Sequence, residues 1–115
     1  MYDNLYCKMF IDTDLTYEEL FALLLKYTDG KKQAVTYINT QWCDISVQKN
    51  REYDAERYFV DPSEFLYWKY YLDIEPNDTK ESIYIKKISD FLGYIKEHCN
   101  DAIAACDFED DLINL

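Results

Sequence analysis

Few residues of this sequence have the type and spacing that catalysis requires. The only histidine, His98, falls near the end of a predicted helix, where a histidine more often favours the helix dipole than acts as a general base. No Cys-His metal spacing, glycine-rich phosphate loop or G-x-S-x-G motif occurs. Acid pairs such as Glu18-Glu19 and Asp110-Asp111 are adjacent in sequence. At the start of a helix, acidic side chains are favoured by the helix dipole, so such a pair needs no catalytic explanation. We therefore expect a protein that is not an enzyme and that needs no metal or cofactor.

The four cysteines show no spacing that indicates cross-links. Cys7, Cys43, Cys99 and Cys106 form no C-x-x-C pair, and hydrophobic residues make up 49% of the 115-residue chain, enough for a core without disulfides. We expect four free thiols that pack as small hydrophobes. The N-terminus also lacks the basic residues and long apolar core of a signal peptide. Together these features predict a cytoplasmic protein.

Charge is the property that most restricts the choice of partner. The chain has 23 acidic and 12 basic side chains, which give a net charge of −11 and a pI of about 4.3. Nucleic acid and anionic membrane are poor partners for such a surface. A basic protein is favoured, because opposite charges accelerate encounter. The alternative is that the acidity only keeps the chain soluble.

Two amphipathic helices are predicted from apolar residues at helical spacing. The first begins after Thr16, which with Glu19 has the spacing of a capping box, and Gly30 supplies its C-terminal stop. The same cap pattern recurs at residues 78–81 and predicts a second helix that runs to about Glu97.

Alternating apolar residues predict strands that pair into one sheet. These strands lie near residues 5–12, 33–49, 64–75 and 102–108. Segment 33–49 fits one bulged strand or a short hairpin, and the charged segment 49–63 is predicted as a loop. The order of elements is that of the split βαβ, ferredoxin-like plan, in which both helices cover one sheet face. We expect one α+β domain over residues 1–115.

The other face of this sheet would stay open and rich in aromatic side chains. We expect it to carry Tyr6, Phe10, Trp42, Phe65, Tyr67 and Tyr71. Aromatic patches of this kind are typical of interface cores. Three occupants fit equally well: a different protein, a second copy of this chain as in a homodimer, or the 49–63 loop.

Acidic and aromatic side chains outside the predicted core are the candidates for contact with a basic protein. From Asp101 onward there are five acids and no base, which fits either a solvated tail or a negative binding surface. The candidate partner-binding residues are Asp44, Glu52, Tyr53, Asp54, Tyr67, Tyr71, Asp107, Glu109, Asp110 and Asp111.

Two segments resemble those of small immunity proteins of bacterial toxin systems. They are Phe65-Leu66-Tyr67-Trp68-Lys69-Tyr70-Tyr71-Leu72-Asp73-Ile74-Glu75 and, after a helix, Ala104-Ala105-Cys106-Asp107-Phe108-Glu109-Asp110-Asp111-Leu112. The chain is most similar, over about residues 5–112, to immunity proteins that guard against contact-dependent growth inhibition toxins.

This resemblance implies a cytosolic protein that binds the C-terminal domain of a cognate toxin, often a nuclease, and blocks it. Contact residues vary between cognate pairs in such families, so the resemblance assigns no individual site residue. The acidity of the chain fits a nuclease, whose substrate surface must be basic. The first alternative is an acidic adaptor module unrelated to toxins, and the second is a small enzyme with an acid-based site.

Overall fold

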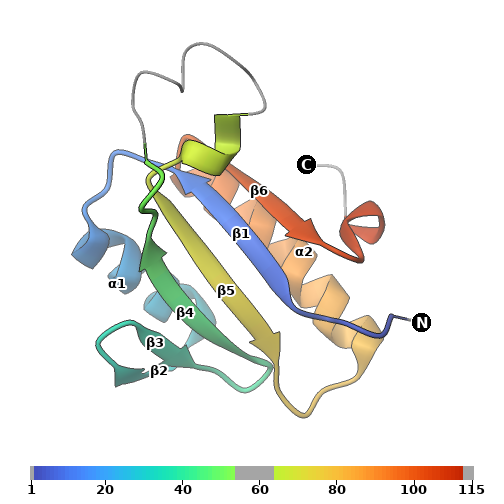
Figure 1. Cartoon of the computed structure of the whole chain (residues 1–115). Helices are drawn as coiled ribbons and strands as arrows, with labels where there is room; N and C mark the ends of the chain where they lie inside the picture. Colours follow the sequence, from blue (N-terminus) through green and yellow to red (C-terminus); the bar gives the residue numbers. More distant parts are fainter. Residues whose placement is uncertain (1, 54–63, 113–115) are drawn as a thin grey trace.

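Alternating apolar and polar residues build one antiparallel sheet of six strands, and two helices pack behind it (Figure 1). The computed structural model describes residues 2–53 and 64–112. Its strands are β1 (Cys7–Asp12), β2 (Lys31–Ala34), β3 (Tyr37–Asn39), β4 (Cys43–Lys49), β5 (Tyr70–Pro76) and β6 (Asp101–Cys106). Its helices are α1 (Tyr17–Thr28) and α2 (Glu81–His98), with short 3-10 turns η2 (Glu64–Tyr67) and η3 (Glu109–Asp111).

The strands lie side by side in the order β2-β3-β4-β5-β1-β6, and every neighbouring pair is antiparallel. The prediction of an α+β fold with one sheet and two helices is confirmed. The sheet order is not the simple ferredoxin-like pattern, because β2 and β3 extend the sheet beyond β4. Segment 33–49 is neither a single bulged strand nor only a hairpin, since it contributes to three strands.

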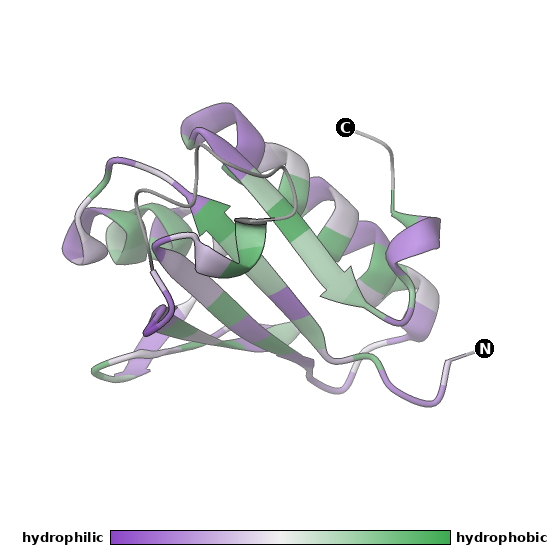
Figure 2. Ribbon diagram, turned by 45° about the horizontal axis from the view of Figure 1, so that its top comes forward, coloured by the Kyte–Doolittle hydropathy of each residue, from purple (hydrophilic) through white to green (hydrophobic). Residues whose placement is uncertain are grey.

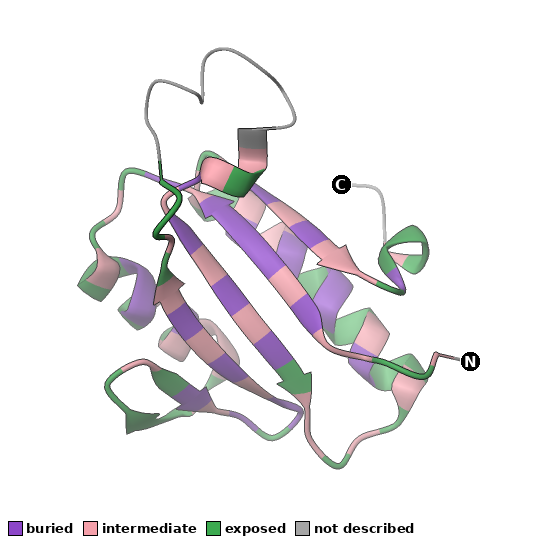
Figure 3. Cartoon of the chain, in the orientation of Figure 1, coloured by how far each residue is buried: buried purple, intermediate pink, exposed green. Residues whose placement is uncertain are grey.

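The core lies between the sheet and the helices. Along β4 and β5, buried residues alternate with more exposed ones, and β1 departs from this pattern only at Phe10, which is also buried (Figures 2 and 3). One side chain in two therefore faces the helices. The fully buried strand residues include Met9, Ile11, Ile45, Leu72 and Ile74, and the helices add Leu20, Leu24, Tyr84, Ile88 and Phe91. The two helices also touch each other, because the ring of Tyr27 on α1 lies 4.1 Å from that of Tyr94 on α2.

The capping box predicted for α1 is present. Thr16 Oγ1 accepts a hydrogen bond from the Glu19 N–H at 3.2 Å, and Glu19 Oε1 accepts one from the Thr16 N–H at 2.9 Å. The predicted stop at Gly30 is wrong, since Asp29 takes the left-handed conformation that ends the helix, with φ of 53°. Gly30 is required for a different reason: a Cβ there would lie 2.7 Å from Ile38 Cγ2.

The cap predicted for α2 at residues 78–81 is also wrong. Lys80 occupies the N-cap position, and its side chain makes no capping hydrogen bond. The helix is held instead by its apolar face, where Tyr84, Ile88, Phe91 and Ile95 are fully buried. Among the described residues, neither this helix nor α1 combines the length and apolarity needed to cross a membrane.

The predicted strand over residues 64–75 is wrong in its first half. Residues Glu64–Tyr67 form η2, and β5 starts only at Tyr70. The reason is packing: the Phe65 ring lies 5.3 Å from the ring of Phe10, on the sheet face opposite the helices. Part of the predicted 49–63 loop, residues 54–63, lies outside the described residues.

The Thr16 cap generates a stability prediction. Thr16→Ala removes the acceptor for the Glu19 N–H and should lower the free energy of unfolding by about 1 kcal/mol. Thr79→Ala is the matched control, because Thr79 lies before the uncapped start of α2, and it should cost less than about 0.5 kcal/mol. Urea denaturation at neutral pH measures both values, and equal losses in the two variants would contradict the assignment of the cap.

Candidate protein-binding face

The sheet face turned away from the helices is the candidate site. It is the face toward the viewer in Figure 1, and no helix of the described residues covers it. Side chains on this face alternate with the buried ones: Asp44 and Ser46 flank Ile45, and Tyr71 and Asp73 flank Leu72. We call it the open face.

Three carboxylates occupy neighbouring positions on the open face, and we call them the acid cluster: Asp44, Asp73 and Glu75. Asp44 on β4 lies directly opposite Glu75 on β5, and Asp73 is the next residue on the same face of β5. Like charges placed directly opposite in antiparallel strands are destabilising. Within residues 2–53 and 64–112, no Lys or Arg forms an ion pair with any of the three.

Neutral donors hold two of these carboxylates. The amides of Asn39 and Asn77 both donate to Asp44 Oδ1, the second at 3.3 Å, and the Tyr6 hydroxyl donates to Asp73 Oδ1. Burial, followed by this hydrogen bond, raises the pKa of Tyr6 above its usual value of 10.0. Asp44 Oδ2 and the exposed Glu75 carboxylate accept no hydrogen bond from the described residues. Both are therefore available to a cation from outside.

Aromatic rings pack beside the acid cluster and form what we call the aromatic cluster: Phe10, Phe65, Trp68 and Tyr71. The ring of Phe10 lies 5.3 Å from Phe65 and 6.1 Å from Tyr71, and Trp68 lies 6.4 Å from Phe65. Phe10 and Trp68 are buried, whereas Phe65 and Tyr71 stay half-exposed. The cluster thus presents rigid apolar surface next to negative charge.

Lys8 separates the two clusters without neutralising the acids. It lies opposite Asp73 in the β1–β5 register. Its Nζ instead lies over the aromatic rings, 4.2 Å from the Tyr71 centroid and 5.3 Å from the Phe10 centroid. Lys8 therefore forms no ion pair with the acid cluster, although it is the register partner of Asp73.

Of the residues predicted from sequence, the structure brings Asp44 and Tyr71 to the open face. Tyr67 is half-buried on η2, next to the aromatic cluster. The prediction that Trp42 lies on this face is wrong. Trp42 is buried on the helix side, with its ring 5.9 Å from Tyr84 and 6.1 Å from Phe91. Asp73 and Glu75 were not among the candidates, and the strand register that makes them neighbours of Asp44 has no local sequence signal.

The two described loop candidates do not join the acid cluster. Glu52 and Tyr53 are exposed and follow the last residue of β4, whereas Asp44 is near its first residue, about 17 Å away along the strand. Tyr53 lines a groove of about 350 Å³ beside the start of α1, together with Tyr17 and Lys49. Asp54 lies outside the described residues.

The remaining candidates form a second acidic surface at the edge of the sheet. Asp107, Glu109, Asp110 and Asp111 are all exposed in the turn that follows β6, which we call the acidic turn. The turn is anchored by Phe108, which is fully buried with its ring 5.9 Å from Tyr84. The Tyr2 hydroxyl donates to Asp111 Oδ2 at 2.5 Å, and this bond raises the pKa of Tyr2 to about 12. Through Asp111 these acids belong to a structured turn rather than to a solvated tail.

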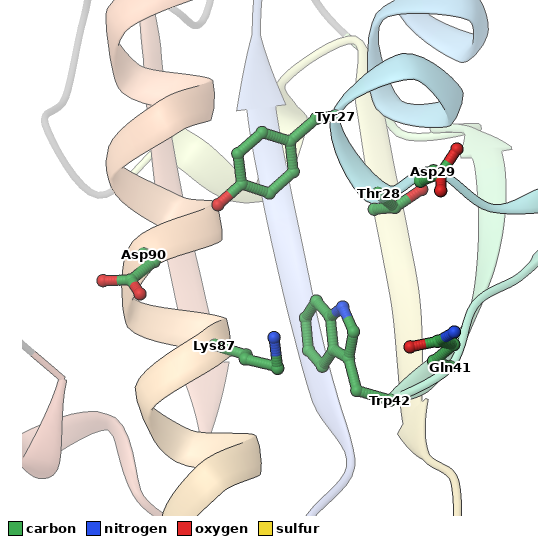
Figure 4. Close-up of a pocket in the computed structure, with 7 residues that line it drawn as sticks. All are labelled: Tyr27, Thr28, Asp29, Gln41, Trp42, Lys87 and Asp90. Atoms are coloured by element: carbon green, nitrogen blue, oxygen red, sulfur yellow. The ribbon is translucent and has the colours of Figure 1, made fainter.

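A cleft of about 250 Å³ lies on the helix side, between the end of α1 and the middle of α2 (Figure 4). Charges of both signs surround it, and Lys87 Nζ lies 6.0 Å from the Trp42 ring. Its lining contains no Cys, Ser or His: Tyr27, Thr28, Asp29, Gln41, Trp42, Lys87 and Asp90. Because the cleft carries charges of both signs, it attracts a basic protein less strongly than the acid cluster does.

The side chains with metal-binding chemistry are dispersed. Among the described residues, no three His, Cys, Asp or Glu side chains come together as metal ligands. His98 is exposed at the end of α2, stacked 4.1 Å from the Tyr94 ring, with Nδ1 2.9 Å from the Tyr94 carbonyl oxygen.

Fold and site together define an α+β protein with one helix-covered face and one open face that is both acidic and aromatic. No family model, curated protein or solved structure matches the chain. The assignment of function therefore depends on the chemistry of this surface.

The Tyr6–Asp73 hydrogen bond generates a pH prediction. Tyr6→Phe removes the donor to a half-buried carboxylate and should lower the free energy of unfolding by about 1 kcal/mol at neutral pH. Because the pKa of Tyr6 is raised in the folded state, its contribution is present below pH 10.0 and is lost as the pH rises above it. The variant should therefore lose less stability than the wild type between pH 7 and about pH 11.

Tyr37→Phe is the control, because the exposed Tyr37 on β3 makes no hydrogen bond through its hydroxyl within the described residues. Urea denaturation at both pH values gives the comparison. A Tyr6→Phe profile parallel to that of the wild type would show that this hydroxyl is not the group that titrates.

Proposed function

We propose that this protein binds a basic partner protein through the open face of its sheet, and that the partner is the toxic domain of a bacterial toxin, which it neutralises. Binding covers the substrate surface of the toxin and needs no catalysis by this chain. The observation that carries the proposal is the pair of facing carboxylates, Asp44 and Glu75, without an ion-pair partner in the described residues.

The cost of this arrangement supports a binding role. Facing acids repel each other in the unbound protein, and a fold selected only for stability would place opposite charges there. The other facing acid pair of the same sheet face, Asp12 and Asp101, has Lys96 Nζ 3.9 Å from Asp101. A Lys or Arg side chain from a partner would relieve the repulsion between Asp44 and Glu75 in the same way.

The chemistry of a nuclease toxin complements this face. A nucleic-acid-binding surface must expose Lys and Arg, and an inhibitor with a net charge of −11 is steered to it. The half-exposed rings of Phe65 and Tyr71 add apolar area beside these charges, with Lys8 Nζ already 4.2 Å from the Tyr71 centroid, so the match extends from charge to shape. The acidic turn lies at the sheet edge and adds to the long-range attraction.

The proposal also bears on the cellular compartment and on the fold class. An inhibitor that must meet a toxin acting on cellular nucleic acid would act in the cytoplasm, where we place this protein. The strands β4, β5, β1 and β6 with the two helices fit the split βαβ plan implied by the resemblance to immunity proteins, with β2 and β3 as an addition at one edge.

Charge reversal on the open face tests the electrostatic part. Glu75→Lys should slow association with a candidate toxin domain encoded by a neighbouring gene by roughly 5-fold at low ionic strength, and the difference should shrink as salt is added. Glu97→Lys is the matched control: it makes the same charge change at an exposed residue of α2, on the helix side. Stopped-flow or surface-based kinetics across a salt series measures both.

If both variants slowed association equally, the effect would come from net charge alone. The open face would then not be the binding site. If Glu109→Lys, Asp110→Lys and Asp111→Lys together slow association while Glu75→Lys does not, the acidic turn is the contact surface. If the encoded neighbour does not bind, the toxin assignment fails and the adaptor function replaces it.

The aromatic cluster generates a separate prediction for dissociation. Tyr71→Ala should weaken binding by about 2 kcal/mol, equivalent to roughly 30-fold, mainly through faster dissociation, because a central aromatic anchor is lost. Tyr53→Ala, which removes an exposed ring from the loop after β4, should change dissociation little. A larger effect at Tyr53 than at Tyr71 would move the anchor from the open face to the loop. Circular dichroism should first confirm that both variants keep the fold.

A further inference from the structure

Two of the four cysteines lie directly opposite each other in the sheet. Cys7 on β1 is the register partner of Cys106 on the edge strand β6. Register partners point to the same face, and their Cα atoms are about 4.5–5.5 Å apart in an antiparallel pair. A disulfide requires Cα atoms about 4.4–6.8 Å apart, so this pair fits without movement of the strands. Neither Cys43 nor Cys99 has a cysteine as register partner.

The two thiols are also in contact and unequal. Cys7 is fully buried, whereas Cys106 is partly exposed at the end of β6. The Cys7 thiol donates a hydrogen bond to the Lys8 carbonyl oxygen, with 3.9 Å between Sγ and the oxygen. The neighbouring Cys7 thiol lowers the pKa of Cys106, whereas the neighbouring Cys106 sulfur and burial raise the pKa of Cys7. Cys106 is also the more exposed of the two, so it is the better nucleophile.

The other two cysteines provide the contrast. Burial raises the pKa of Cys43 to about 12 and also raises the pKa of Cys99. Cys99 is partly exposed like Cys106, so access alone does not distinguish them. What distinguishes Cys106 is the thiol of its register partner Cys7, which can resolve an oxidised sulfur.

We propose that Cys7 and Cys106 are a redox-sensitive pair, which a peroxide converts to a disulfide between β1 and β6. The Cys106 thiolate attacks one peroxide oxygen, the O–O bond breaks, and the released hydroxide takes up a proton to leave as water. The Cys7 sulfur then attacks the sulfenic acid at Cys106, forming the S–S bond while a second water leaves. In total, two thiols are oxidised, one peroxide is reduced, and two waters form.

The position of the pair gives the disulfide a structural consequence. β6 is an edge strand, held in the sheet by β1 alone, and the acidic turn begins one residue after Cys106. A covalent bond to β1 would fasten this edge and the turn that follows it. Because the linked residues are almost the full chain length apart, the bond also restricts the unfolded state strongly.

Peptide mapping after oxidation tests the proposal directly. The folded wild-type protein is treated with hydrogen peroxide, free thiols are blocked with an alkylating reagent, and the digested protein is analysed by mass spectrometry without reduction. We expect a Cys7–Cys106 cross-linked peptide, with Cys43 and Cys99 recovered as alkylated thiols. Dithiothreitol should restore four thiols. A peroxide-treated protein in which Cys99 reacts as fast as Cys106, or in which Cys106 reaches sulfinic acid without a bond to Cys7, would overturn the proposal.

Two single variants make the result specific. Cys106→Ser should abolish the intramolecular disulfide, and Cys99→Ser should form it at the wild-type rate. The oxidised wild type should unfold at a higher temperature than its reduced form, whereas peroxide should leave the melting temperature of Cys106→Ser unchanged. A lower melting temperature for the disulfide form would show that the pair is not built for the bond. If Cys106→Ser fails to fold, Cys106→Ala provides the same test.

Discussion

Both helices cover the same face of the sheet, and the rest of this structure depends on that arrangement. The fully buried residues of β1, β4 and β5 all point toward α1 and α2, where they pack against Leu20, Leu24 and Phe91. Strict alternation then turns every second residue of the same strands to the opposite side. That side receives the acid cluster and the aromatic cluster, with only η2 packed against one end of it. The open face is thus a consequence of how the core is built.

The side chains on the open face show that it is not ordinary solvent-exposed surface. A solvated sheet face usually mixes small polar residues with charges of both signs, which lowers repulsion between neighbouring strands. Here two carboxylates face each other across β4 and β5, and the nearest ammonium group, on Lys8, is directed to the aromatic rings. Charge and apolar area are therefore separated into adjacent regions, as in interfaces where steering and anchoring are performed by different residues.

The local parts of the fold could be predicted from sequence, and the non-local parts could not. The capping box at Thr16 and the apolar spacing after it identify the start and the buried face of α1, because both signals lie within a few residues. Trp42 was assigned to the wrong face because Thr40 closes a turn there. Its Oγ1 accepts from the Trp42 N–H at 3.2 Å and the Cys43 N–H at 3.0 Å, so the alternation starts only at Cys43. Likewise, the aromatic run after Phe65 has strand composition, but contact with Phe10 from a distant strand makes its beginning a 3-10 turn.

In the candidate site, too, residues with a local sequence signal could be predicted and residues placed by strand register could not. Asp44 and Tyr71 could be selected from residue type and strand parity alone. Glu75 could not, because its relation to Asp44 depends on the register between β4 and β5, and Cys7 and Cys106 were likewise predicted as unrelated free thiols. Register across nearly the whole chain length is set by tertiary packing.

The most direct test of the open face uses the two tryptophans, which report on opposite sides of the molecule. Trp68 packs with Phe65 in the aromatic cluster, and Trp42 lines the cleft between the helices. Their indole N–H signals can be followed in a nitrogen-15 correlation spectrum while the proposed partner, a candidate basic toxin domain, is added. A protein that binds through the open face should show a large shift of the Trp68 signal and little change at Trp42. A shift confined to Trp42 would place the partner on the helix side and contradict the account.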